Sequence, residues 1–136
     1  QLLDFMSETK ADFTNTFRNL PKLITAPEAF NAETDNKLKL SDKFSDWSAK
    51  WTAKIAGEVK SVDEALGNMN KINPLFIPRN HQIQRVIDFA IEAEDYEPLE
   101  QIFSAVTNPF GENPQLKHLS EPPKPEEEIK QTFCGT

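Results

Sequence analysis

The sequence predicts an all-helical protein. Large apolar residues recur three or four positions apart along most of the chain, the spacing that places them on one face of an α-helix. Three pairs of a Thr or Ser with an acidic residue three positions later mark helix starts at Thr9, Thr25 and Ser61. No stretch alternates apolar and polar residues convincingly over the length of a strand. We therefore expect a bundle of helices and helical hairpins.

The first twenty residues carry one apolar face, formed by Leu2, Leu3, Met6, Phe13, Phe17 and Leu20. The capping pair at Thr9 leaves two alternatives open, a single helix or a second helix that begins there. Either should end at Pro21. A short helix with Pro27 in its first turn should then run to about Ala32, followed by a polar loop over Asn31 to Asn36.

The middle of the chain predicts two helices and an extended segment. The first carries a stripe of five large apolar residues, Leu40, Phe44, Trp47, Trp51 and Ile55. Gly57 should end it in the left-handed conformation. Ser61 should cap a helix that runs through Met69. Pro74 to Pro78 cannot continue a helix, so this segment should be extended and partly buried.

The last elements predict a helical hairpin and a tail. Asn80 should cap a helix through Ile91, and Asp95 to Pro98 should open a second one through Val106. We therefore expect a helical region over residues 1–111 and an extended, acidic, Pro-rich tail over residues 112–136. The tail carries four apolar residues that could dock it on something, Leu116, Leu119, Ile129 and Phe133.

Composition excludes several functional classes. The chain has 136 residues, a net charge of -7, a pI near 4.8 and a mean hydropathy of -0.58. This acidity argues against nucleic-acid binding, and no apolar run approaches the ~20 residues of a membrane span. The excess negative charge lies in residues 88–136, which carry 11 acids and 3 bases. A solvated surface or a docking surface for a basic partner both explain that excess.

The usual catalytic motifs cannot be written in this sequence. Its four glycines stand singly, which excludes a phosphate-binding loop. His81 and His118 are 37 positions apart, and neither has a second His or a Cys at helical spacing, which argues against a metal site. The acids of Glu92 to Glu100 lack the pattern of a calcium loop and predict a solvated connection. Trp47 and Trp51 could stack on a ligand or belong to the core.

The single cysteine, Cys134, excludes an internal disulfide framework and is compatible with a reducing compartment. Its place near the end of the chain leaves two interpretations, an incidental residue or an exposed, reactive thiol. The first residues do not have the charged, apolar and small-residue pattern of a secretory leader, so we expect none, and Gln1 in first place leads us to expect a piece of a longer protein. We expect that protein to lie in the cytoplasm, most simply of a bacterium.

Four ordered strings resemble one known family. They are Ala11 to Arg18, Met69 to His81, Asn108 to Pro114, and the terminal Thr132 to Thr136. Together they resemble the C-terminal part of the selenoprotein O family, over essentially the whole chain. Membership implies a protein-kinase-like fold in a pseudokinase that binds ATP in an inverted orientation. Such an enzyme transfers AMP to Ser, Thr or Tyr hydroxyls of proteins, with magnesium or manganese.

The resemblance also indicates what this chain would contribute. None of the family's catalytic, nucleotide-binding or metal-binding motifs matches a position here, so we carry over none of those residues. The Cys-Gly-Thr ending places Cys134 at the family's terminal redox position. Our hypothesis is that the tail lets Cys134 reach an upstream cysteine near the active site and regulate it by oxidation.

Two functions remain from the sequence. In the first, the chain is an inactive structural and regulatory part of a protein adenylyltransferase, supporting the large lobe of an upstream kinase-like core that acts on protein substrates. In the second, it is a stand-alone all-helical interaction module. A part cut from a larger lobe should expose apolar surface, so we expect self-association through Trp47, Trp51, Leu75 or Phe76.

Overall fold

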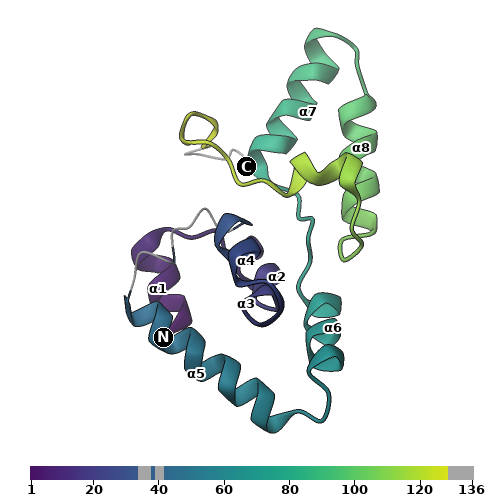
Figure 1. The fold of residues 1–136 in the computed structure, drawn as a ribbon. Helices are drawn as coiled ribbons and strands as arrows, with labels where there is room; N and C mark the ends of the chain where they lie inside the picture. Colours follow the sequence, from purple (N-terminus) through teal and green to yellow (C-terminus); the bar gives the residue numbers. More distant parts are fainter. Residues whose placement is uncertain (34–37, 39–41, 129–136) are drawn as a thin grey trace, which may run out of the picture. The chain divides into compact units, whose positions relative to one another are not determined.

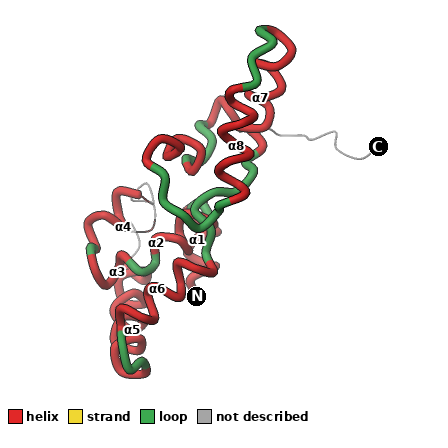
Figure 2. Tube along the Cα trace, turned by 90° about the vertical axis from the view of Figure 1, so that its right-hand side faces the viewer, coloured by secondary structure: helices red, strands yellow, loops and turns green. Residues whose placement is uncertain are grey.

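The computed structural model describes residues 1–33, 38 and 42–128. Within these residues every regular element is helical, as the apolar spacing predicts (Figures 1 and 2). The chain divides into two compact units, residues 1–75 and residues 76–136. The expected boundary at residue 111 between a helical region and a tail stays a prediction. None of the helices in the described residues has the length and hydropathy needed to cross a bilayer.

The described residues of the first unit form six α-helices. They are α1 (Leu2–Thr9), α2 (Phe13–Asn19), α3 (Lys22–Thr25), α4 (Pro27–Glu33), α5 (Asp42–Glu58) and α6 (Val62–Ile72). Helices α1 and α3 pack on α5, while α2 and α3 pack on α4. The resulting core consists of Phe5, Met6, Leu20, Phe30, Leu38 and Phe44. The long α5 thus packs against short helices that precede it in the sequence.

The start of the chain forms two helices, which decides between the alternatives left open at Thr9. The Thr9 hydroxyl donates to the Phe5 carbonyl inside α1, so it caps nothing. Asp12 is the N-cap of α2, where its carboxylate accepts the Asn15 amide at 2.8 Å. Between the two helices Lys10 has a φ of 53°, and the Ala11 amide donates to the Met6 carbonyl at 3.0 Å. This is the Schellman type of helix ending.

The predicted aromatic stripe lies on α5 and belongs to the core. Phe44 is buried, and its ring centroid lies 5.6 Å from that of Trp47, which stacks in turn on Trp51. Leu40 lies outside the described residues, as do residues 34–36 of the predicted polar loop. The prediction for Gly57 is wrong, because α5 continues through it to Glu58 without a left-handed φ. Core packing, rather than ligand binding, accounts for the tryptophan pair.

A buried arginine joins α2 to the end of α6. The Arg18 side chain is 7% exposed, and its Nη1 donates to the carbonyls of Asn70 at 2.8 Å and Asn73 at 3.2 Å. Helix α6 itself begins as predicted, with the Ser61 hydroxyl accepting the Glu64 amide. A cation at a helix C-terminus is favoured because the last carbonyls carry partial negative charge. Arg18 therefore satisfies carbonyls that α6 cannot satisfy by itself.

The second unit is built on a hairpin of α7 (Asn80–Glu92) and α8 (Glu97–Thr107). The two helices run side by side in both views (Figures 1 and 2). The N-cap of helix α7 is Arg79, one residue before the predicted N-cap, Asn80. The preceding segment is extended as expected, with Phe76 buried and its amide donating to the Pro109 carbonyl at 3.2 Å.

The expected tail is only partly extended. Residues Pro114–Ser120 form the 3₁₀ helix η2, which packs on α8, and Pro125–Glu127 form a short 3₁₀ turn, η3. Leu116 and Leu119 are buried in η2, so two of the four apolar residues named for docking do dock. Ile129 and Phe133 lie outside the described residues. The Asn113 side chain accepts the Gln115 amide and so starts η2.

The four apolar residues expected to mediate self-association are buried or half-buried. Phe76 is 3% exposed, and Trp47 and Trp51 pack against the core of the first unit. Phe76 is therefore not part of an exposed apolar surface, and self-association through the half-buried tryptophans and Leu75 stays a prediction. The exposed large apolar side chains lie mainly on α7 and α8 instead.

Candidate functional site

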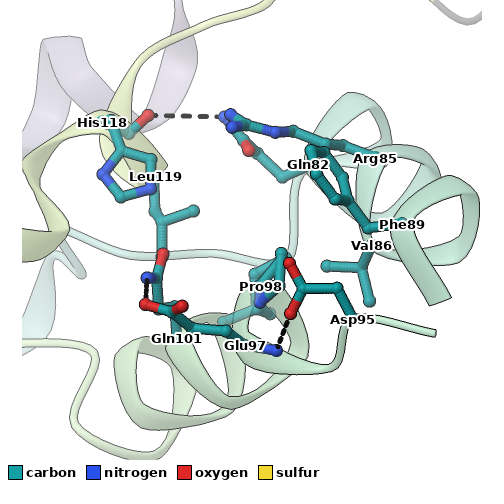
Figure 3. A pocket seen from close by; sticks show the side chains of 11 residues that line it. Gln82, Arg85, Val86, Phe89, Asp95, Glu97, Pro98, Gln101, His118 and Leu119 are labelled. Atoms are coloured by element: carbon teal, nitrogen blue, oxygen red, sulfur yellow. Dashed lines mark hydrogen bonds between the residues drawn. The ribbon is translucent and has the colours of Figure 1, made fainter. Parts of the chain in front are cut away.

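A cavity with convergent polar groups lies in the second unit, between α7, α8 and η2 (Figure 3). Its volume is about 200 Å³. Helix α7 contributes Val86 and Phe89 to its wall, and η2 contributes Leu119. The polar lining consists of Gln82, Arg85, Asp95, Glu97, Gln101 and His118. Acidic, basic and amide groups thus meet in one small space.

Most of these polar groups already take part in hydrogen bonds of the second unit. The Asp95 carboxylate accepts the Glu97 amide at 3.0 Å at the start of α8, as the sequence predicts for this turn. Gln101 donates to the Glu97 carboxylate at 3.1 Å. Gln82 donates to the His118 carbonyl at 3.4 Å and so connects α7 to η2 (Figure 3). The arrangement can receive a small polar group, but its hydrogen bonds are those of a structural turn.

Arg85 lies at the edge of the cavity on α7. Its guanidinium carbon is 5.5 Å from the centroid of the Phe89 ring, one helical turn further along. An arginine over an aromatic ring is held by the electron-rich face of that ring. Arg85 thus brings a positive charge to the same cavity lining as Asp95 and Glu97, which belong to the acidic segment that the sequence singles out.

Glu94 in that connection has a strained backbone. Its φ is 52°, a conformation that costs an L-amino acid roughly 1 kcal/mol relative to glycine. We expect Glu94→Gly to raise the stability of the hairpin by about 1 kcal/mol, measured by hydrogen exchange of the α7 and α8 amides. Glu94→Ala removes the same charge but keeps the strain. Equal effects of the two substitutions would contradict this explanation.

A second, shallower hollow lies beside the start of α7. It is lined by Arg79, Asn80, His81, Pro123 and Glu127, among others, with a volume of about 540 Å³. Glu127 accepts the Lys124 amide at 2.9 Å, and this hydrogen bond is the main reason that the pKa of Glu127 is lowered. The pKa of His81 is also lowered, because partial burial disfavours the imidazolium; Glu127 opposes this effect and Arg79 adds to it.

The lowered pKa of His81 predicts a loss of stability in mild acid. The unfolded chain, where the pKa is near 6.5, takes up the proton before the folded chain does. The contribution of His81 is therefore complete above that pH and is lost as the pH falls through it. We expect the unfolding free energy to fall more between pH ~8 and pH ~5 in the unsubstituted chain than in His81→Gln. Urea unfolding at each pH measures this, and parallel pH profiles would refute it.

The structure does not bring the sequence-predicted candidates together as a catalytic set. His81 and His118 line different hollows. In the described ranges, no three His, Cys, Asp or Glu side chains gather as metal ligands would. Cys134 lies outside the described residues. Sequence analysis missed Arg18 and Gln82, whose roles depend on residues 52 and 36 positions away, and only the string ending at Arg18 hinted at the first.

Comparison with known proteins identifies the family. The profile described as "Protein adenylyltransferase SelO" matches residues 1–107. The chain belongs to the SelO family. This match begins at the first residue and ends at Thr107, the last residue of α8. The resemblance drawn from the four sequence strings is thereby confirmed.

Curated relatives in the SelO family carry the name "Protein nucleotidyltransferase YdiU". One from Bradyrhizobium sp. (strain ORS 278) is 39% identical over 99% of this chain, and one from Rhodopseudomonas palustris (strain BisB18) is 40% identical over 99%. One from Maridesulfovibrio salexigens is 36% identical over 99%. The chain spans 27% of the length of each of these relatives. No solved structure matches the chain.

Proposed function

We propose that the chain is the helical C-terminal part of a protein nucleotidyltransferase that transfers AMP from ATP to Ser, Thr or Tyr hydroxyls of proteins. The observation that carries this proposal is the SelO family match over residues 1–107, joined by relatives named as protein nucleotidyltransferases. ATP, and magnesium or manganese, would then be bound by the kinase-like core of the longer protein. The role of this chain would be structural and regulatory, in a pseudokinase of the cytoplasm.

The chemistry of AMP transfer supports this division of labour. Attack of a hydroxyl on the α-phosphorus develops negative charge on the phosphate oxygens, which cations and backbone amides must stabilise. A glycine-rich loop, a lysine and metal-binding carboxylates usually provide that stabilisation. Here the four glycines stand singly, and the carboxylates of Asp95 and Glu97 accept hydrogen bonds within the hairpin. These features favour placing the transfer site in the polypeptide beyond this chain.

The proposal is tested by comparing two proteins. The product of the complete reading frame should transfer labelled AMP from ATP to protein hydroxyls in the presence of Mg²⁺ or Mn²⁺. The 136-residue chain alone should neither do so nor bind ATP in a calorimetric titration. ATP binding by the short chain at millimolar affinity or better would contradict the proposed division. A reading frame without a kinase-like Gly-rich loop and Lys would favour the alternative, a stand-alone helical interaction module.

Cys134 supplies the regulatory part of the proposal. In the oxidised state its sulfur would be bonded to a cysteine of the upstream core. The two thiols would lose two protons and two electrons to an oxidant such as a peroxide or a small disulfide. AMP transfer by the full-length protein should then respond to a dithiol reductant, and Cys134→Ser should abolish the response. Peptide mapping without reductant that finds only free Cys134 in the oxidised, regulated enzyme would overturn it.

A further inference from the structure

The α7–α8 hairpin has a second apolar face, on the side away from the cavity. Five large side chains form it, and we call it the outer face: Ile83 (38% exposed), Ile87 (44%) and Ile91 (76%) on α7, with Leu99 (48%) and Phe103 (66%) on α8. On each helix these residues are spaced by four positions, so they lie in one row. Each helix of the hairpin thus carries one such row.

Helical geometry separates the outer face from the face that is already covered. On α7 the cavity is lined by Gln82, Val86 and Phe89, and the 3.6-residue repeat turns Ile83, Ile87 and Ile91 away from them. On α8 the same repeat turns Leu99 and Phe103 away from Pro98 and Gln101. The cavity side is closed by η2, whose Leu116 and Leu119 are buried. The hairpin is thus apolar on two sides, and within the described part of its own unit η2 covers only one of them.

Such a surface is typical of a protein interface. Isolated exposed apolar residues are ordinary, but a contiguous patch of large ones marks a site of association. The outer face combines an aromatic side chain with four branched aliphatic ones, the composition expected for the dry centre of an interface. Exposed acids flank it, Asp88 on α7 and Glu100 on α8. A complementary surface would therefore be apolar in the centre with basic residues around it.

The comparisons indicate which polypeptide carries that complementary surface. Relatives match 99% of this chain with only 27% of their own length, so most of each relative is polypeptide that this chain does not contain. The family profile includes both helices of the hairpin. We propose that the outer face docks on the remaining part of the SelO-family polypeptide, in the same molecule. This inference rests on the proposed function and adds to it the surface by which the helical part holds the core.

Thiol labelling tests the docking directly. Phe103→Cys is prepared in a Cys134→Ser background, both in the 136-residue chain and in the full-length protein, and its reaction with a maleimide is followed by peptide mass spectrometry. Ser104→Cys, an exposed neighbour on α8, is the matched control. We expect labelling at position 103 to slow on the order of tenfold or more in the full-length protein. Labelling at position 104 should change much less.

A measurement on unsubstituted proteins covers the case in which these substitutions disturb folding. Hydroxyl-radical oxidation of Ile87, Leu99 and Phe103 should fall in the full-length protein, while oxidation of the exposed Ile72 on α6 serves as reference. Equal reactivity of the outer face in both proteins would overturn the proposal. Protection already present in the 136-residue chain would also overturn it. Protection at every concentration would assign the face to residues 1–75, and protection only at high concentration would indicate a second copy of the chain.

The docking proposal and the proposed function fail separately. AMP transfer is measured on the same full-length preparation. Absence of transfer with a protected outer face would refute the proposed function alone. Transfer with an unprotected outer face would refute the docking alone.

Discussion

Replacing Phe44 with Ala lowers the unfolding free energy of the first unit by about 4 kcal/mol, the largest effect that we expect from one substitution. Phe44 is 4% exposed and lies at the centre of the aromatic cluster. Its ring stacks on Phe30 at 5.9 Å and on Trp47 at 5.6 Å, and meets the edge of Phe5 at 6.2 Å. Truncation leaves a cavity among three helices that cannot all move to fill it.

Tryptophan fluorescence during urea unfolding measures this loss. The only two tryptophans, Trp47 and Trp51, lie on α5, so the signal reports on the first unit. Phe44→Leu should cost only about 1.5 kcal/mol, which keeps the test informative if the Ala variant does not fold. Lys43→Ala, on the exposed side of the same helix, should change stability little. A loss below about 1 kcal/mol for Phe44→Ala would contradict this account of the core.

Replacing Arg18 with Met lowers the stability of the same unit by about 3 kcal/mol. The substitution keeps an unbranched side chain in a buried position but removes the donor to the carbonyls of Asn70 and Asn73. Those carbonyls end α6 and would remain without this charged partner. Hydrogen bonds from a charged group contribute more than neutral ones, which is why the expected loss exceeds that of an ordinary surface contact.

The comparison with Lys distinguishes charge from geometry. Arg18→Lys keeps the positive charge at the C-terminus of α6 but loses the planar fork that presents several donors at once. We expect an intermediate loss, about 1 to 2 kcal/mol, again from tryptophan fluorescence. Hydrogen exchange should show that the last turn of α6 opens more readily in both variants. If Arg18→Met and Arg18→Lys lose the same stability, the charge contributes nothing measurable.

The spacing of the apolar residues predicted the helices well, because the residues on one helical face are buried together when the chain folds. The stripe from Phe44 to Ile55, the helix after Ser61 and the hairpin after Pro78 all follow from local pattern and local capping. The errors are local as well. Asp12, and not Thr9, caps α2, and α5 continues through Gly57 to Glu58.

The candidate site was harder to predict from the sequence, because its residues on α7, α8 and η2 lie far apart along the chain. The cavity forms only when η2 packs on α8, and Gln82 finds its partner at His118 only then. The apolar side chains of Leu116 and Leu119 predicted that the tail could dock, but they did not predict on which helix. The outer face shows the reverse situation. The apolar residues of the predicted helix through Ile91 include Ile83, Val86 and Ile87, but only the structure separates the buried Val86 from the exposed isoleucines.

The folding of the hairpin unit extends beyond the family match. That match stops at Thr107, yet the Pro109 carbonyl anchors the Phe76 amide, and η2 buries Leu116 and Leu119. A protein shortened to the matched region would uncover the cavity side of α7 and α8 while the outer face is already exposed. Both apolar sides of a two-helix unit would then meet water, which favours aggregation over folding. A chain that ends at Ser120 is therefore the shortest one in which η2 still covers one apolar side of the hairpin.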